Sequence, residues 1–217
     1  MRFRAVVFDL WQTLVPWPAE SALELYAQMA DAAGAQREEF VAAWHTHRER
    51  RETGPLADSV RVLFDALRLE ADPEVVLSLR RKWTRAALVP RPGALETLAE
   101  LRRRGHVLGL ITVCSEDVSQ EWESSAFGGT FDARVFSCDA RLSKPDPRIY
   151  ELCCKRLGVQ PDEVLYVGDG ANYELPGAQR VGMTAVQLRV PGEELTEPGR
   201  EWRGATITSL EEVLELA

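Results

Sequence analysis

The chain opens on an apolar segment and then changes its hydrophobic period. Residues 4–9 contain four consecutive apolar residues, a run typical of a strand that is buried on both faces. From residue 19 to about residue 88, apolar residues instead recur at helical spacing. A clear example is the set Val60, Leu63, Phe64 and Leu67. Because no convincing strand interrupts this block, the sequence predicts a small all-helical region.

Two proline-rich segments flank the helical block. The first reads Val15-Pro16-Trp17-Pro18, and the second reads Val89-Pro90-Arg91-Pro92-Gly93. Proline stiffens such connections, and a pair of them around one block indicates a separate unit joined to the rest by a hinge. We therefore expect a helical cap domain over residues 16–91. The remainder, residues 1–15 and 92–217, would form the core domain.

Strands and helices alternate after Gly93. Strands are expected over residues 107–112, 134–137, 163–167 and 183–188. Helices are expected over residues 94–104, 116–126, 147–157 and 174–181. Ser209 and Glu212 have the spacing of a capping box for a last helix. This alternation predicts an α/β fold, with a doubly wound, Rossmann-like parallel sheet built from right-handed βαβ units.

Composition narrows the function classes. The 217 residues are 45% hydrophobic and 28% charged, as in ordinary soluble enzymes, and the formal net charge is -8. This charge argues against a nucleic-acid or anionic-membrane surface. The sequence shows neither a signal-peptide layout nor an apolar segment of about 20 residues that would span a membrane. Four cysteines without metal-binding spacing indicate reduced, packed thiols, so we expect a cytoplasmic protein. Its expected oligomeric state is a monomer or a homodimer.

Polar residues follow the predicted strands at the points where these strands end. Asp9 closes the first strand, Thr112 ends the next, and Asp169 follows strand 163–167. Lys144 lies in the loop sequence SKPDP. The carboxyl ends of strands form the ligand-binding edge of an open α/β sheet, so these four side chains should converge there. Each has a structural alternative, such as a turn aspartate, a β-forming threonine or a loop charge, but four together at one edge indicate a site.

Four motifs resemble, in order, those of the haloacid dehalogenase superfamily of hydrolases. They read VVFDLWQTL, LGLIT, LSKPDPRIY and VLYVGDGANYELPGA, and together with the block between the first two they extend over the whole chain. One class of these enzymes carries a helical cap between the first and second motifs, where this chain has its helical block.

The resemblance implies a role for each residue. Asp9 would be the nucleophile that forms a covalent ester. Thr112 would donate a hydrogen bond to an anionic substrate oxygen. Lys144 would neutralise the substrate and keep Asp9 ionised. The implied cofactor is Mg²⁺, held by Asp9, the backbone carbonyl of Trp11 and Asp169. Glu174 would support this metal site from behind, and the partner would be a small anionic substrate.

Trp11 departs from the phosphatase pattern. In the phosphatases that this sequence resembles, the residue two after the nucleophile is an aspartate that protonates the leaving group. An indole cannot move that proton, and general acid–base catalysis contributes roughly 10²–10⁴-fold. The dehalogenases also have an aromatic residue there and use no metal. Gln12 replaces a usual glycine, whereas the GDGANYE segment keeps the metal-binding pattern of the phosphatases.

The helical block contains candidate substrate residues. Trp44, Arg48 and Arg51 are spaced to share one face of a helix, so Arg48 or Arg51 would reach an anion above Asp9. The alternative is a solvated face with an Arg48–Glu52 ion pair. His45 and His47 are expected to be exposed helix residues rather than ligands.

Three functional hypotheses follow from these observations. The first, which we favour, is a Mg²⁺-dependent phosphatase-type hydrolase of a small phosphorylated metabolite, biased towards activated phosphates. The second is a metal-independent dehalogenase of small 2-halo acids. The third is a catalytically weak binding or regulatory protein on the same fold. The effect of a chelator separates the first two, and Asp9-dependent turnover would exclude the third.

Overall fold

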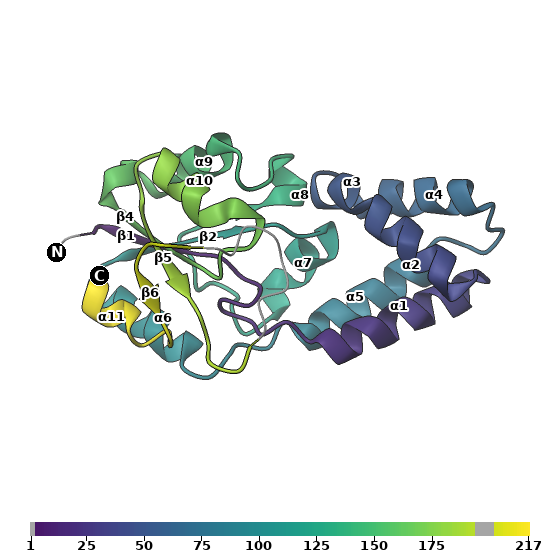
Figure 1. The fold of residues 1–217 in the computed structure, drawn as a ribbon, viewed down its shortest axis with the longest axis horizontal. Coiled ribbons are helices and arrows are strands. Elements are labelled where there is room, and N and C mark those ends of the chain that lie inside the picture. The colour runs from purple at the N-terminus through teal and green to yellow at the C-terminus, as the bar shows by residue number, and fades with distance from the viewer. Residues whose placement is uncertain (1–2, 194–201) are drawn as a thin grey trace.

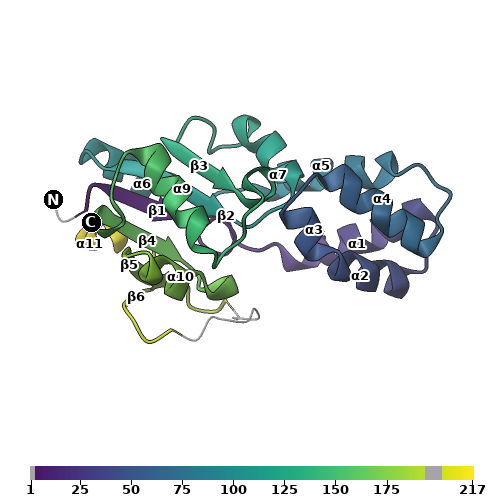
Figure 2. The same cartoon turned by 90° about the horizontal axis from the view of Figure 1, so that it is seen from above.

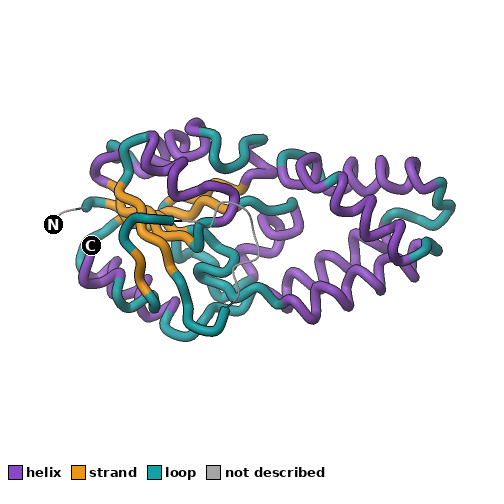
Figure 3. The backbone as a smooth tube through the Cα atoms, viewed as in Figure 1, coloured by secondary structure: helices purple, strands orange, loops and turns teal. Residues whose placement is uncertain are grey.

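The protein has two lobes, one built on a sheet and one built only of helices (Figure 1). The computed structural model describes residues 3–193 and 202–217. Figure 3 shows the strands gathered in one lobe and the other lobe formed by helices. Both chain ends lie on the sheet lobe, away from the helices of the other lobe (Figure 1).

The sheet confirms the expected doubly wound parallel architecture. Its described strands are β1 (Ala5–Phe8), β2 (Val107–Thr112), β3 (Ala133–Phe136), β4 (Val164–Gly168), β5 (Thr184–Leu188) and β6 (Thr206–Ile207). All pairs are parallel, and the order across the sheet is β3-β2-β1-β4-β5-β6. The strand order switches between β1 and β4, because the chain adds strands first from β1 towards β3 and then from β4 towards β6. Ligands bind at such a switch point.

Helices cover both faces of the sheet. The helices of this lobe are α6 (Ala94–Arg103), α7 (Glu116–Glu121), α8 (Ser137–Ala140), α9 (Pro147–Leu157), α10 (Glu174–Arg180) and α11 (Val213–Leu216). In β1, Val6 and Phe8 pack with residues of α6 and α11, whereas Ala5 and Val7 pack with residues of α9 and α10. The continuous apolar run of β1 therefore reflects burial on both faces, as the sequence predicted.

The helical lobe has a hydrophobic core of its own. It consists of α1 (Ala19–Ala33), α2 (Arg37–Thr46), α3 (Arg48–Glu52), α4 (Leu56–Leu67) and α5 (Glu74–Ala87). Met29, Phe40, Leu63 and Val76, from four of these helices, are fully buried together. Among the described residues, no helix combines the length and apolar character needed to cross a membrane.

Several predicted boundaries are wrong, for local reasons. The helix expected over residues 116–126 ends at Glu121 and continues as a 3₁₀ turn, Trp122–Ser124, where serine hydroxyls bond to backbone carbonyls. Neither α8 nor β6 was expected. Glu212 does accept a hydrogen bond from the Ser209 amide, at 3.1 Å, but helix α11 begins only at Val213. The predicted capping box is therefore absent.

A buried ion pair joins the two lobes along α5 and α7. The Asp117 carboxylate is fully buried and accepts a hydrogen bond from Arg80 at 2.7 Å. The hydroxyls of Ser115 and Thr84 also donate to it. Burial raises the pKa of Asp117, but Arg80 and the hydroxyls outweigh burial and lower it below its ordinary value. The helices of this contact, α5 and α7, lie side by side in both views (Figures 1 and 2).

We expect Asp117→Asn to destabilise the protein by about 3–5 kcal/mol, because it leaves the Arg80 guanidinium buried without a counter-charge. Denaturant unfolding followed by circular dichroism measures the loss. Asp58→Asn is the matched control, since the Arg61–Asp58 pair is exposed and such pairs contribute about 0–1 kcal/mol. Equal losses in both variants would show that the Asp117 contact does not hold the lobes together.

Candidate active site

The site lies at the carboxyl edge of three neighbouring strands. Asp9 directly follows β1, Thr112 ends β2, and Asp169 directly follows β4. Because β1 lies between β2 and β4, Asp9 lies between the other two residues. Lys144 reaches the same place from the loop before α9. The structure thus brings Asp9, Lys144 and Asp169 together, and it places Thr112 at the same edge of the sheet.

Lys144 is the centre of a buried polar cluster. Its ammonium Nζ lies 2.5 Å from Asp9 Oδ1 and 2.6 Å from Glu174 Oε2, and it donates to the Tyr166 hydroxyl at 3.0 Å. Tyr166 in turn donates to Glu174 Oε2 at 2.8 Å. Sequence reasoning missed Tyr166, because an aromatic residue inside a strand carries no sign of a polar partner.

Burial and charge oppose one another in this cluster. Burial disfavours the ammonium of Lys144, but the carboxylates of Asp9 and Glu174 outweigh it and raise the pKa of Lys144. For Asp9, burial is the larger effect and raises its pKa to about 6, although Lys144 lowers it. Lys144 thus favours the ionised form of Asp9, while burial opposes it.

Three carboxylates at this edge are placed to bind a cation. Oxygen atoms of Asp9, Asp169 and Glu174 all lie within 4.8 Å of one another, and all three residues are buried. Lys144 Nζ contacts Asp9 and Glu174, and Asp169 adds a third buried carboxylate beside this pair. Carboxylate oxygens are ligands that Mg²⁺ prefers. These residues therefore fit a magnesium ion.

Glu174 already has partners on both of its oxygens. Oε2 accepts from Lys144 and Tyr166, and Oε1 accepts from the backbone N–H of Gly170 at 2.9 Å. Asp169 lies in the same turn, and its Oδ1 accepts from the N–H of Ala171 at 3.0 Å. These contacts agree with a supporting position for Glu174, behind the two aspartates.

Two hydroxyls complete the surroundings of Asp9. Thr13 donates to Asp9 Oδ2 at 3.2 Å, an interaction that the sequence analysis did not anticipate. The Thr112 hydroxyl is buried, and the described residues offer it no hydrogen-bond partner. An orphaned buried hydroxyl is costly, so a ligand oxygen would satisfy it. Thr112 is not among the residues that line the cavity, so its role as a donor to the substrate stays a prediction.

Arg91 fixes the turn that follows Asp9. Its side chain donates to the carbonyls of Thr13 at 2.8 Å and Gln12 at 3.0 Å, and it pairs with Glu193 at 2.8 Å. Gln12 adopts a left-handed backbone conformation, with φ of 58°, which is strained for a residue with a side chain. The second proline linker therefore holds the turn that precedes the first, a pairing over 78 residues that no local pattern reveals.

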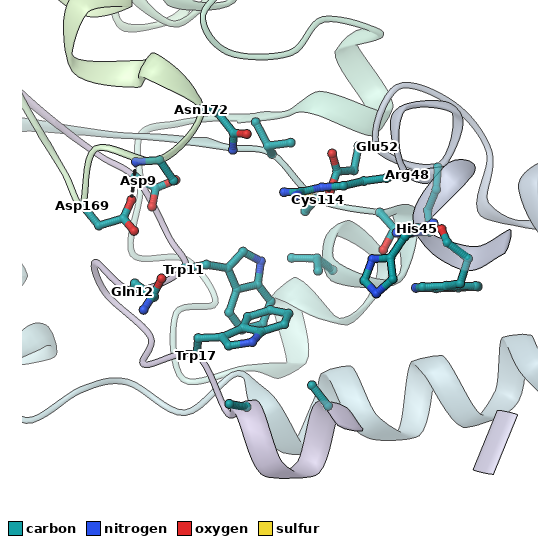
Figure 4. A pocket seen from close by; sticks show the side chains of 18 of the residues that line it. Asp9, Trp11, Gln12, Trp17, His45, Arg48, Glu52, Cys114, Asp169 and Asn172 are labelled. Atoms are coloured by element: carbon teal, nitrogen blue, oxygen red, sulfur yellow. Dashed lines mark hydrogen bonds and ion pairs between the residues drawn. The ribbon is translucent and has the colours of Figure 1, made fainter. Parts of the chain in front are cut away.

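A cavity of about 420 Å³ extends from this edge to the helical lobe. Figure 4 shows Asp9 and Asp169 on one side of it and Arg48, Glu52 and His45 on the other. Its volume is typical of a small-molecule site. Residues from both lobes line the cavity, so the helical lobe as well as the sheet lobe would determine which ligand it binds.

The two candidate arginines of the helical lobe differ in their surroundings. The chain breaks its helix at His47, between α2 and α3, so Trp44, Arg48 and Arg51 do not share one continuous helix. Arg48 lines the cavity and also forms the expected ion pair with Glu52, at 2.8 Å, while its contact with an anion stays a prediction.

Arg51 is not on a solvated face. It is buried, donates to the Trp44 carbonyl at 2.7 Å and lies over the Trp44 ring at 4.2 Å. Burial lowers its pKa to about 10. Although Arg51 lines the cavity wall, its guanidinium is committed to Trp44. His45 is exposed, as expected, yet it too lines the cavity.

A doubly wound parallel sheet with a cluster of carboxylates and a lysine at its switch point has its polar groups where α/β proteins bind ligands. Residues 3–182 match the family model of haloacid dehalogenase-like hydrolases, and the chain belongs to this family.

Related proteins perform two different reactions. A glyceraldehyde 3-phosphate phosphatase of Methanopyrus kandleri is 33% identical over 201 residues, covering 86% of this chain and 84% of that protein. An (S)-2-haloacid dehalogenase 4A of Burkholderia cepacia is 28% identical over 200 residues, covering 87% and 84%. The crystal structure of a HAD phosphatase from Thermococcus onnurineus matches with a TM-score of 0.71 at 25% identity, covering 98% of this chain and 97% of that one. Membership alone therefore leaves both reactions open.

Proposed function

We propose that the protein is a Mg²⁺-dependent phosphatase-type hydrolase of a small phosphorylated compound. The observation that carries this proposal is the group of three buried carboxylates, Asp9, Asp169 and Glu174, whose oxygen atoms lie within 4.8 Å of one another. A reaction without a metal does not require a second aspartate beside the nucleophile. Similarity to the glyceraldehyde 3-phosphate phosphatase over most of both chains also supports this proposal.

In the proposed reaction, Asp9 is the nucleophile. One oxygen of its carboxylate attacks the phosphorus, and the bond to the leaving oxygen breaks as the new bond forms. Lys144 and the Thr112 hydroxyl bind the phosphoryl oxygens, where negative charge must be stabilised. Water then attacks the phosphorus of the aspartyl phosphate, which releases phosphate and restores Asp9. Thr13 and Lys144 hold the Asp9 carboxylate in one orientation throughout.

The magnesium ion would be held by Asp9, the Trp11 carbonyl and Asp169, with Glu174 in support. When bound, it supplies positive charge to the phosphoryl oxygens and screens the repulsion between the carboxylates. Within this proposal, residues 16–91 act as the cap domain on a core of residues 1–15 and 92–217. The cap supplies Arg48, on the far side of the cavity, as a contact for the rest of an anionic substrate.

A second candidate function is the hydrolysis of small 2-halo acids. Trp11 favours it, because a halide leaves without a proton and needs no acid at position 11. Similarity to the (S)-2-haloacid dehalogenase 4A also favours it. In that reaction the Asp9 carboxylate would attack the carbon that bears the halogen, and the metal would be unnecessary.

We expect Mg²⁺ to bind the wild-type protein and to bind Asp169→Ala at least about tenfold more weakly, since the variant removes one of the two aspartate ligands. Isothermal titration of the metal-free protein measures both affinities. Asp139→Ala, which replaces an aspartate outside the cavity lining, is the control and should bind normally. Turnover of acetyl phosphate should stop with chelator and return with Mg²⁺.

The same measurements separate the two candidate functions. Absence of Mg²⁺ binding at millimolar concentration, together with chelator-insensitive turnover of 2-chloropropionate, would establish the dehalogenase reaction instead. If neither acetyl phosphate nor 2-chloropropionate is consumed in an Asp9-dependent way, both proposals fail and a binding role on this fold takes their place.

A further inference from the structure

Three tryptophans form one wall of the cavity. The ring centroids of Trp11 and Trp17 lie 5.3 Å apart, those of Trp11 and Trp83 lie 6.2 Å apart, and those of Trp17 and Trp83 lie 5.9 Å apart. Trp11 follows the proposed nucleophile, Trp17 lies in the first linker, and Trp83 comes from α5 of the helical lobe. We call these three residues the tryptophan wall. It extends across both lobes and begins two residues from Asp9.

The tryptophan wall keeps exposed surface, although Trp11 and Trp83 also pack against the two hydrophobic cores. The structural tryptophans Trp44 and Trp122 are 2% and 0% exposed, whereas Trp17 is 41% exposed and Trp11 and Trp83 are half-buried. All three wall residues line the cavity, and Figure 4 shows Trp11 and Trp17 next to its open space. Indole surface left in contact with water is available for a ligand, because covering it is favourable.

At Trp83, the tryptophan wall presents ring surface rather than a free hydrogen-bond donor. The indole N–H of Trp83 donates to the Ser21 hydroxyl at 3.0 Å, so its polar atom is already engaged. Trp11 and Trp83 are nearly parallel, at 28°, and Trp17 meets Trp11 edge-on, at 84°. Such a surface selects a flat, apolar group by stacking and edge contacts.

Nearby arginines argue against a cationic ligand on this wall. The Arg80 guanidinium lies 5.0 Å from the Trp83 ring centroid, and Arg51 lies 4.2 Å from that of the adjacent Trp44. The Arg80 guanidinium, which is paired with Asp117, already makes the cation–π contact at Trp83 that a quaternary ammonium ligand would seek. The remaining ring surface of the wall suits a neutral arene.

We infer that the substrate is a phosphate monoester of an aromatic alcohol, with its phosphate at Asp9 and its ring on the tryptophan wall. This inference rests on the proposed phosphatase function and names its substrate class. A phenol oxygen leaves more readily than a sugar oxygen because the ring stabilises its negative charge. Trp11 stands where the phosphatases have a proton-donating aspartate. It would thus contact a leaving group that needs no proton donor.

The reaction balances with water as the only co-reactant. An Asp9 oxygen forms a bond to phosphorus while the bond from phosphorus to the aryl oxygen breaks. The phenolate departs with the electron pair and takes a proton from water. A second water attacks the phosphorus of the aspartyl phosphate, which yields phosphate and the free Asp9 carboxylate.

Binding of non-hydrolysable phosphonates tests this inference apart from turnover. With Mg²⁺ present, we expect phenylphosphonate and 1-naphthylphosphonate to bind about tenfold or more tightly than methylphosphonate, as burial of one aromatic ring implies. Calorimetric titration measures all three. Trp17→Ala should reduce this preference about three- to tenfold, whereas Trp202→Ala, which removes an indole outside the cavity lining, should leave it unchanged.

Other outcomes would overturn the inference. Equal affinity for methyl- and arylphosphonates, or tighter binding of a trimethylammonium-ethyl phosphonate, would show that the wall does not select arenes. The wild-type series alone decides this if Trp17→Ala does not fold. Mg²⁺-dependent turnover of acetyl phosphate by a protein without aryl preference would leave the proposed function standing and reject only the substrate class.

Discussion

Replacing Asp9 by asparagine is expected to lower turnover by about four orders of magnitude or more, as loss of a nucleophile does in other hydrolases. An amide oxygen is a poor nucleophile, and the neighbouring Asp169 and Glu174 are held by other contacts. The measurement is the rate of phosphate release from acetyl phosphate and 4-nitrophenyl phosphate at saturating Mg²⁺. Mass spectrometry must exclude deamidation of the introduced asparagine back to aspartate.

The fold of this variant is expected to survive. Burial raises the pKa of Asp9 to about 6 in the metal-free protein. Above that pH, the folded protein holds an ionised carboxylate that burial destabilises. Stability gained from the raised pKa is complete below about pH 4 and is lost as the pH rises through about 6. At about pH 7 the metal-free Asp9→Asn protein loses a carboxylate that burial disfavours, and Glu174 still supplies a counter-charge to Lys144, so we expect the variant to fold. Wild-type-like turnover by the intact variant would show that the nucleophile is misassigned.

The second large effect concerns the leaving group. Because Trp11 cannot donate a proton, we expect acetyl phosphate and 4-nitrophenyl phosphate to be hydrolysed about 10²–10⁴-fold faster than sugar phosphates. The second half-reaction also lacks a base at this position, so aspartyl phosphate on Asp9 should accumulate after rapid mixing. The measurement is kcat/KM over a series of leaving groups, with the intermediate detected after acid quenching.

Trp11→Asp should flatten this dependence and shorten the life of the intermediate, because it restores a proton-transfer group beside the leaving oxygen. Trp11 is half-buried against Trp17 and Trp83, so the change should also cost about 1–3 kcal/mol of stability. Trp11→Phe is the matched control, since it disturbs the same packing without supplying an acid.

A flat leaving-group dependence in the wild type would contradict this account of Trp11. Another residue would then supply the proton, and His45 is the first to examine because it lines the cavity from the helical lobe. The variant His45→Gln would then make the dependence steep.

The sequence by itself determined the chemistry at the sheet edge. Apolar runs marked the strands, and Asp9, Thr112 and Asp169 end or follow them. We expected these residues at one edge because parallel strands present their carboxyl ends at a single edge of the sheet. Helical spacing between two proline linkers likewise located the helical lobe. These signals are local, because strand period, helix period and turn residues depend on neighbours along the chain.

Only the tertiary structure decided which distant residues meet. Asp117 and Arg80 are 37 residues apart, and Arg91 binds carbonyls 78 and 79 residues before it. The helix break at His47 turned Arg51 inward onto Trp44, and folding placed Trp17 and Trp83 beside Trp11. Such pairings follow from how helix faces pack between lobes, which no local period encodes. The polar groups at the sheet edge were thus predictable, whereas the lining of the cavity was not.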